Sequence, residues 1–238
     1  LLISSSFSIL TYNSIAVFMS IAPIIIAFSL SRSFLKQSFA SSLPNSSNSI
    51  LDNFKKHKVQ SIAVCLIHAY ANSEHEEKVI NHIKNYWPEI DIVASHQITR
   101  EWREYERTNT TILCSYVKPI ARNYLDKLSK KLIESNFKGN PYVMQSNGGI
   151  DTFESTKNIP LTMIESGPTS GVLGAAELGK LINEKNIISL DVGGTTAKCS
   201  LIENGNVKIN TNYWIEKNRL SAGYPVMLPV VDIVEIGN

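Results

Sequence analysis

The sequence predicts an α/β fold on three observations. An apolar run rich in β-branched residues, "VQSIAVCLIHAY", is followed by a helical segment and a second apolar run, which is the pattern of a βαβ unit. A later apolar run ends in an aspartate and two glycines and continues into another strand, which predicts a hairpin. The chain has 238 residues, 43% of them hydrophobic, enough for one large domain or two small ones with a core.

The first predicted elements form the βαβ unit. After the strand, "NSEHEEKVINHIKNYW" predicts a helix that Asn72 or Ser73 caps and that acidic residues in the first turn favour. Pro88 ends this helix, and "DIVASHQI" predicts the next strand. A βαβ unit implies a parallel sheet that is covered by helices.

The later elements follow in order. "TREWREYERTNTT" leads into an amphipathic helix from about Thr110 to Ser135, and "YVMQSNGG" predicts a short buried strand and a turn. "LTMIESGPTSGVLGAAELGKLI" predicts a strand, a Gly-Pro turn and a helix with Pro168 in its first position. The hairpin "SLDVGGTTAKCSLIENGNVK" comes next, with a second tight turn at 203–206, and the chain continues into "AGYPVMLPVVDIVEI".

Composition argues against several functional classes. The net charge is +2 and the basic residues are dispersed, which does not suggest a nucleic-acid surface. Cys65, Cys114 and Cys199 are far apart and odd in number, so they form neither a zinc pattern nor a disulfide framework. A reducing, cytoplasmic setting is therefore the expected location.

Residues 1–48 differ from the rest of the chain. The first 31 residues carry no charge, and residues 14–30 form a nearly continuous apolar run that contains Pro23. Three interpretations stay open at this point. The run is a membrane segment followed by Arg32 and Lys36 on its cytoplasmic side, a segment foreign to the fold, or a buried core element.

The hairpin carries the main candidate site. Asp191 ends an apolar strand, where its carboxylate can reach a metal ion or a metal-bound water. Gly193 and Gly194 permit positive φ and leave room for an anion at backbone N–H groups, and Thr195 and Thr196 add hydroxyl donors. The pattern predicts a phosphate-binding hairpin, and the alternative is an ordinary hairpin with a solvent-facing acid.

Two other segments are candidate anion sites. Ser166 and Gly167 stand at a predicted helix N-terminus, which favours anions, although the glycines that follow also suit close helix packing. Asn147 and Gly148 follow a predicted buried strand, where α/β proteins place ligand loops, and a simple turn is the alternative.

The charged segment "REYERT" is open to two interpretations. Arg103, Glu106 and Arg107 could recognise a substrate carboxylate or carbonyl through a guanidinium fork, or they could belong to a salt-bridge network. A metal site at His68 and His75 with the neighbouring glutamates is conceivable, but the spacing fits no helical ligand pair.

Six segments in one order resemble the hydantoinase A / 5-oxoprolinase family, which includes the ATP-dependent subunits of acetone carboxylase. They are "SIAVCLIHAYANSEHE", "REYERTNTT", "MQSNGG", "SGPTSGVLGAA", "LDVGGTTAK" and "AGYPVMLPVVDIVEIG". The resemblance covers about 51–237. Six ordered motifs are far more specific than any one of them alone.

The resemblance implies an incomplete actin/sugar-kinase-like ATPase fold with nucleotide between two lobes, and with ATP and Mg²⁺ as cofactors. Asp191 would then be a catalytic residue, and Asp191 to Thr196 would be the second of two phosphate hairpins. Lys198 stands where many relatives have a second aspartate, and it could pair with a phosphate or point to solvent. A cyclic amide or ketone substrate and a hydantoinase B-like partner subunit are also implied.

The expected organisation has three parts. Residues 1–48 are the apolar, serine-rich segment, residues 49–165 are a hydantoinase A-like region, and residues 166–238 begin a second ATPase lobe. The family's first hairpin is absent, so we expect negligible ATP turnover by this polypeptide alone. The alternatives are a non-catalytic nucleotide- or partner-binding module, with or without a membrane tether, and a sugar-kinase-like phosphotransferase.

Overall fold

The computed structural model describes residues 15–17, 28–30, 43–194, 196–217 and 222–236. Packing divides the chain into two compact units, Leu1–Ala121 and Arg122–Asn238. One long helix, α5 (Glu104–Glu134), contains the division. The sequence-based boundaries after residues 48 and 165 concern family domains rather than packing, and they stay predictions.

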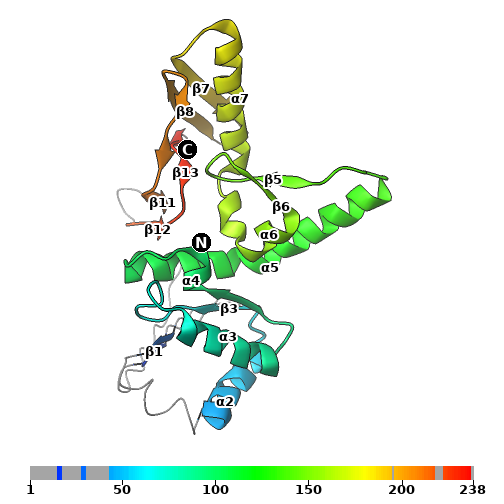
Figure 1. Ribbon diagram of the computed structural model, residues 1–238, viewed down its shortest axis with the longest axis vertical. Helices are drawn as coiled ribbons and strands as arrows, with labels where there is room; N and C mark the ends of the chain where they lie inside the picture. Colours follow the sequence, from blue (N-terminus) through cyan, green and yellow to red (C-terminus); the bar gives the residue numbers. More distant parts are fainter. Residues whose placement is uncertain (1–14, 18–27, 31–42, 195, 218–221, 237–238) are drawn as a thin grey trace. The chain divides into compact units, whose positions relative to one another are not determined.

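The first unit is built around the predicted βαβ element (Figure 1). Strand β3 (Ser61–Val64) pairs in parallel with β4 (Asp91–Ala94), and helix α3 (Glu74–Tyr86) connects them. Every residue of both strands is buried, as expected for a parallel sheet covered by helices. The predicted βαβ unit is confirmed.

Helices α2 (Leu43–Lys56) and α3 complete the core of this unit. Leu51 and Phe54 of α2 pack into the same buried cluster as Ile83 of α3 and the apolar residues of β3 and β4. Acidic residues fill the first turn of α3, and the Asn72 side-chain oxygen accepts a hydrogen bond from the Glu74 N–H at 3.0 Å. Asn72 therefore supplies the capping interaction at this end of the helix.

Most of the apolar run at 14–30 lies outside the described residues. Its described parts are β1 (Ile15–Val17) and β2 (Phe28–Leu30), which pair antiparallel. In the part of the chain that the structure describes, no helix has the length and apolar character needed to cross a membrane. Helix α2 begins at Leu43 and so crosses the sequence-based boundary at residue 48.

The second unit contains an antiparallel sheet in the order β14–β8–β7, with β9 also paired to β8. Helix α7 (Ser166–Ile182) runs along one face of this sheet (Figure 1). Val172 and Ala176 of α7 pack on Ile202 and Val231, and Ile187 adds to this core. The sheet strands are β7 (Ile187–Val192), β8 (Ala197–Glu203), β9 (Asn206–Val207) and β14 (Val234–Ile236).

Smaller elements surround this sheet. Strands β5 and β6 form a hairpin, β10 pairs with β13, and β11 pairs with β12, all antiparallel. Their bounds, with those of two short helices, are β5 (Tyr142–Met144), β6 (Ile150–Thr152), α6 (Phe153–Asn158), η1 (Pro160–Met163), β10 (Ile209–Asn210), β11 (Tyr213–Ile215), β12 (Tyr224–Val226) and β13 (Val230–Val231).

Several predicted elements differ from the structure. The strand expected in "LTMIE" is a 3₁₀ turn, η1, because Pro160 presets a helical φ at its first position. The strand in "DIVASHQI" ends at Ala94, where the buried Ser95 begins the short helix α4 (Ser95–Ile98). Helix α5 begins at Glu104, six residues before the predicted start at Thr110, because two acids in its first turn favour a helix N-terminus.

Candidate phosphate-binding site

The predicted hairpin joins β7 to β8. Asp191 lies opposite Lys198 and Val192 lies opposite Ala197 in the register. The Gly193 N–H donates to the Thr196 carbonyl at 3.0 Å and closes the loop, while Thr195 lies outside the described residues. A second two-residue turn follows at Asn204 and Gly205, both with positive φ, as the sequence predicts.

The loop glycines are not required by the backbone. Neither Gly193 nor Gly194 adopts a positive φ. A Cβ added to Gly194 would meet no atom within 4 Å, and one added to Gly193 would make only an ordinary contact with the Thr196 carbonyl at 3.7 Å. The sequence suggested two reasons for these glycines, a positive φ and room for an anion. The backbone excludes the first reason and is compatible with the second.

A row of three charged side chains crosses the sheet next to the β7–β8 loop. Asp191, Lys198 and Glu235 are direct partners on the adjacent strands β7, β8 and β14. Side chains alternate along a strand, so all three share the face on which Ile187 packs against α7. The Lys198 Nζ lies 3.9 Å from Glu235 Oε1, and Asp191 is exposed.

The same lysine connects the hairpin to α7. Its Nζ lies 2.6 Å from Oε2 of Glu165, the residue immediately before the helix. The two side chains are 19% and 17% exposed, so the ion pair is largely shielded from water. Two segments that the sequence predicts as anion sites are therefore linked by one ion pair.

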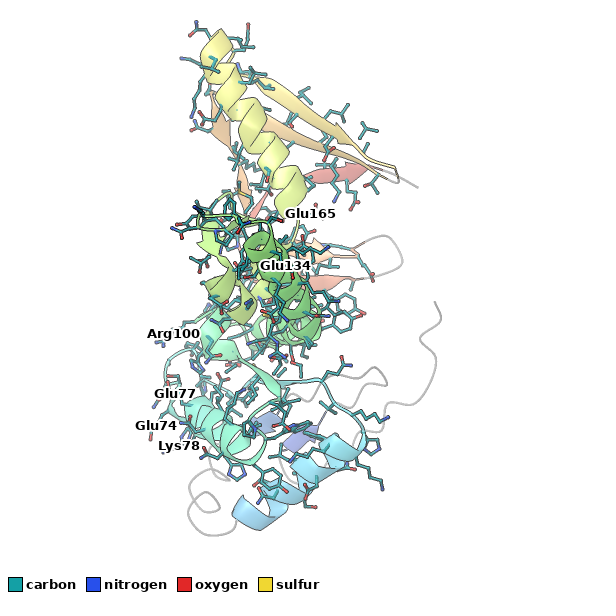
Figure 2. The ribbon with its side chains drawn as sticks, turned by 90° about the vertical axis from the view of Figure 1, so that its right-hand side faces the viewer. Glu74, Glu77, Lys78, Arg100, Glu134 and Glu165 are labelled. Carbon is teal, nitrogen blue, oxygen red and sulfur yellow. The ribbon has the colours of Figure 1, made fainter. Side chains whose placement is uncertain are left out.

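Helix α7 begins at Ser166, so Pro168 is its third residue. The prediction that Pro168 takes the first position of the helix was wrong. Neither Ser166 nor Gly167 is the cap: Glu165 holds that position, in the left-handed region at φ 55°, and its side chain makes no capping hydrogen bond. A Cβ on Gly167 would meet nothing within 4 Å. Figure 2 shows Glu165 at the N-terminal end of α7.

Negative charge gathers around this ion pair. Burial, together with the nearby carboxylates of Glu165 and Glu235, raises the pKa of Tyr213 to about 12. The Tyr213 phenol therefore stays neutral at physiological pH.

The loop after β5 lies against the same helix. The Ser146 carbonyl accepts hydrogen bonds from the Val231 N–H at 2.7 Å and from the Thr169 hydroxyl at 3.4 Å. Gly148 has φ +87°, and a Cβ there would lie 3.0 Å from the Leu173 side chain, so the turn itself requires this glycine. The Asn147 side chain accepts from the Gly149 N–H at 2.8 Å. A ligand role for Asn147 and Gly148 stays a prediction.

The three candidate substrate residues of the first unit have different surroundings. The Arg107 side chain is fully buried and donates to the Leu66 carbonyl at 3.0 Å, and also to Ser95 and Glu104. Arg103 is half-exposed and lies 4.0 Å from Glu106. The structure thus places Arg107 in an ion-pair network, and a substrate role for Arg103 and Glu106 stays a prediction.

Glu76, which the sequence suggested only as a neighbour of His75 in a conceivable metal site, is the centre of that network. Its buried carboxylate accepts from the Leu66 N–H at 2.8 Å, the Ser95 hydroxyl at 2.6 Å, the His96 N–H at 3.0 Å and His96 Nδ1 at 2.6 Å. The signal was its position three, four and seven residues before Val79, Ile80 and Ile83, on the apolar side of the helix.

The proposed histidine metal site does not form in the described part of the chain. No group of three or more potential metal-ligating His, Cys, Asp or Glu side chains gathers there. His68 is exposed, and its Nδ1 lies 3.4 Å from the Tyr70 hydroxyl. His96, which follows β4, has its Nδ1 2.6 Å from the Glu76 carboxylate.

Comparison with known proteins identifies the family. The model of the hydantoinase/oxoprolinase family matches residues 107–238, and that of the hydantoinase/oxoprolinase N-terminal region matches residues 43–87. The second match begins at the first residue of α2, somewhat before the start of the resemblance seen in the sequence.

Individual relatives agree with the family match. An uncharacterised protein of Methanocaldococcus jannaschii is 37% identical over 79% of this chain, which spans 28% of that protein. The caprolactamase alpha subunit of Pseudomonas jessenii is 24% identical over 79% of this chain and 26% of its own length.

A solved structure supports the same assignment. The nucleotide-free structure of acetone carboxylase, solved to study ATP-dependent acetone carboxylation, matches with a TM-score of 0.66 and 29% identity. The match covers 81% of this chain and 27% of that one, so this chain spans about a quarter of the length of the relatives it matches. Two family models, curated relatives and a solved fold agree, and the chain belongs to the hydantoinase/oxoprolinase family.

Proposed function

We propose that this chain carries one half of the ATP phosphate-binding site of an ATP-dependent hydantoinase/oxoprolinase-type enzyme. ATP would supply a phosphoryl group that activates an amide or ketone oxygen. The β7–β8 loop and the N-terminus of α7 would hold phosphate oxygens through backbone N–H groups. Asp191, an exposed carboxylate at the end of β7, offers the oxygen ligand that a magnesium ion or its water prefers.

The observation that carries this proposal is the open space at two glycines. Gly194 in the loop and Gly167 at the start of α7 have no neighbouring atom that excludes a side chain. Glycine has an entropic cost in the folded chain. At a hairpin loop or a helix N-terminus, where backbone N–H groups are available to an anion, a glycine that the fold does not require suggests close approach of a ligand. The Lys198–Glu165 ion pair links the two segments that contain these glycines.

The substrate and the partner are proposals by analogy with relatives. Caprolactamase acts on a cyclic amide, and the protein that resembles this chain is its alpha subunit. Acetone carboxylase acts on a ketone. We propose a cyclic amide or a ketone as the substrate class of the whole protein and a second subunit as its partner. The actin/sugar-kinase-like lobe arrangement is proposed on the same grounds. Family membership favours this function over a sugar-kinase-like phosphotransferase.

Replacing Gly194 with alanine tests the phosphate site directly. The added methyl group meets no protein atom, so the free energy of unfolding should change by less than about 1 kcal/mol. The same methyl would occupy the space of a phosphate oxygen, so binding of Mg²⁺-ATP should weaken. Titration with Mg²⁺-ATP, followed by phosphorus NMR and calorimetry, measures the affinity of the wild type and of Gly194→Ala.

The matched control is Gly174→Ala, also at an open position but in the middle of α7. It should leave Mg²⁺-ATP binding unchanged. Equal binding by the wild type and Gly194→Ala would contradict the phosphate site. Failure of the wild type to bind Mg²⁺-ATP would favour a non-catalytic partner-binding module. ATP turnover at ordinary enzyme rates by the chain alone would contradict the half-site.

A further inference from the structure

We propose that Glu165 is an internal counter-anion of the phosphate site, whose carboxylate occupies the position at Lys198 that an anionic group of the ligand takes on binding. Ligand binding is then an exchange, in which Lys198 leaves one anion for another. This inference rests on the proposed function, and it assigns Glu165 a specificity-determining role within the same site.

The conformation of Glu165 is the first argument. A non-glycine residue in the left-handed region is uncommon and costs of the order of a few RT, so some interaction must offset that cost. A residue at the N-cap position usually has an extended backbone and caps the helix with its side chain. Glu165 does not cap, and its carboxylate contacts Lys198 at 2.6 Å instead. The backbone is therefore arranged around the ion pair.

The place of Lys198 is the second argument. It lies on β8 directly after the loop, opposite Asp191, so an anion bound at the loop would be within reach of its ammonium group. A shielded ammonium–carboxylate pair is stronger than an exposed one, and both side chains are at least four-fifths shielded. The partner that holds Lys198 therefore controls whether it is available to a ligand.

The local charge is the third argument. Glu165, Glu235 and Asp191 contribute three negative charges around the one positive charge of Lys198. An anion approaching this end of the sheet is repelled by these carboxylates and attracted by an ammonium group that is already paired. Removing the charge of Glu165 takes away one repulsion and frees the lysine. The lost repulsion and the freed lysine both strengthen anion binding.

The exchange predicts a gain of affinity when Glu165 is neutralised. In the 238-residue chain, Glu165→Gln should bind Mg²⁺-ATP about tenfold more tightly than the wild type, by calorimetry at constant ionic strength. Lys198→Met should bind more weakly. In the double variant Glu165→Gln/Lys198→Met, the gain should disappear, because the freed lysine is absent. A purely structural role for Glu165 would give a loss in the single variant instead.

Glu177→Gln is the matched control. Glu177 lies on the same helix and also pairs with a lysine, with its Oε1 2.5 Å from Lys180 Nζ, but that pair is exposed. This variant should bind Mg²⁺-ATP like the wild type. Because Glu165→Gln could fail to fold, Glu165→Asn is the second variant: asparagine adopts the left-handed region readily, and it should show the same gain.

The outcomes separate the two proposals. If neither the wild type nor the neutralised variants bind Mg²⁺-ATP, the proposed function is wrong and this inference falls with it. If the wild type binds and folded Glu165→Gln and Glu165→Asn bind equally or more weakly, only the counter-anion role is wrong. Binding that appears only in the neutralised variants supports both.

Discussion

Arg107 is fully buried, and its guanidinium group contacts three different segments of the first unit. It donates to the carbonyl of Leu66 beyond β3, to Ser95 beyond β4, and to Glu104 at the start of α5. The carboxylate of Glu76 lies 4.0 Å from it. Charged groups this deep are stable only when they are paired, so these residues depend on one another.

Replacing Arg107 with methionine should therefore destabilise the first unit by about 3–5 kcal/mol, because the Glu76 carboxylate stays buried after its nearest guanidinium is removed. Urea unfolding followed by circular dichroism measures the change. Arg103→Met is the control: this half-exposed arginine should contribute less than about 1 kcal/mol. Equal stability of the two variants would mean that Arg107 is not part of the structural network.

Helix α7 shows how one element can contain glycines of opposite kinds. A Cβ on Gly179 would lie 2.6 Å from the Glu184 carbonyl and would also collide with the Ile187 side chain, because the chain turns back there from the helix into β7. A Cβ on Gly174 would meet nothing within 4 Å. Close packing thus requires glycine at the end of this helix, but not in its middle.

The two glycines should respond oppositely to alanine. Gly179→Ala should destabilise the second unit by about 1–3 kcal/mol, because a backbone oxygen must move. Gly174→Ala should stabilise it by up to about 1 kcal/mol, because alanine has the higher helix propensity. Thermal melts of both variants compare them, and the idea fails if the two melting temperatures shift in the same direction.

Elements with a strong local signal were predicted well, and those set by distant partners were not. The βαβ unit and the β7–β8 hairpin have clear patterns of β-branched runs and turn residues. The short apolar run at 161–164 fits a strand or a helix equally, and Pro160 decided for a 3₁₀ turn.

The candidate site also has residues that a local sequence pattern reveals and residues whose role depends on a distant partner. Its glycines and Asp191 are visible in the sequence. Glu165 acquires its role only through Lys198, 33 residues later in the chain, and no sequence pattern indicates that contact.

At the scale of the molecule, one surface of the second unit is markedly apolar. The face of the β7–β8–β14 sheet away from α7 carries apolar side chains that are more than half exposed: Ile188, Leu190, Val192, Leu201 and Val234. The chain also has a net charge of only +2. A contiguous apolar patch and a small net charge both favour self-association.

Leu190→Lys should therefore reduce self-association of the 238-residue chain without lowering its stability, because this side chain is 64% exposed. Size-exclusion chromatography with light scattering gives the mass at several concentrations. Ser170→Lys adds the same charge at an exposed position of α7, on the other side of the sheet, and leaves the apolar face intact. If both variants associate equally, charge rather than the apolar face is responsible.

The two Asn-Gly turns have a consequence for the chemical ageing of the protein. Deamidation of asparagine begins when the next backbone nitrogen attacks its side-chain carbonyl, and glycine offers the least hindrance. In the folded chain, the Gly148 N–H donates to the Gln145 carbonyl at 3.0 Å and the Gly205 N–H to the Lys185 carbonyl at 2.7 Å. Both nitrogens are thus held away from attack, so Asn147 and Asn204 should deamidate faster in urea than in buffer, as followed by peptide mass spectrometry. In buffer, the slow appearance of aspartate at either position would record how often that turn opens.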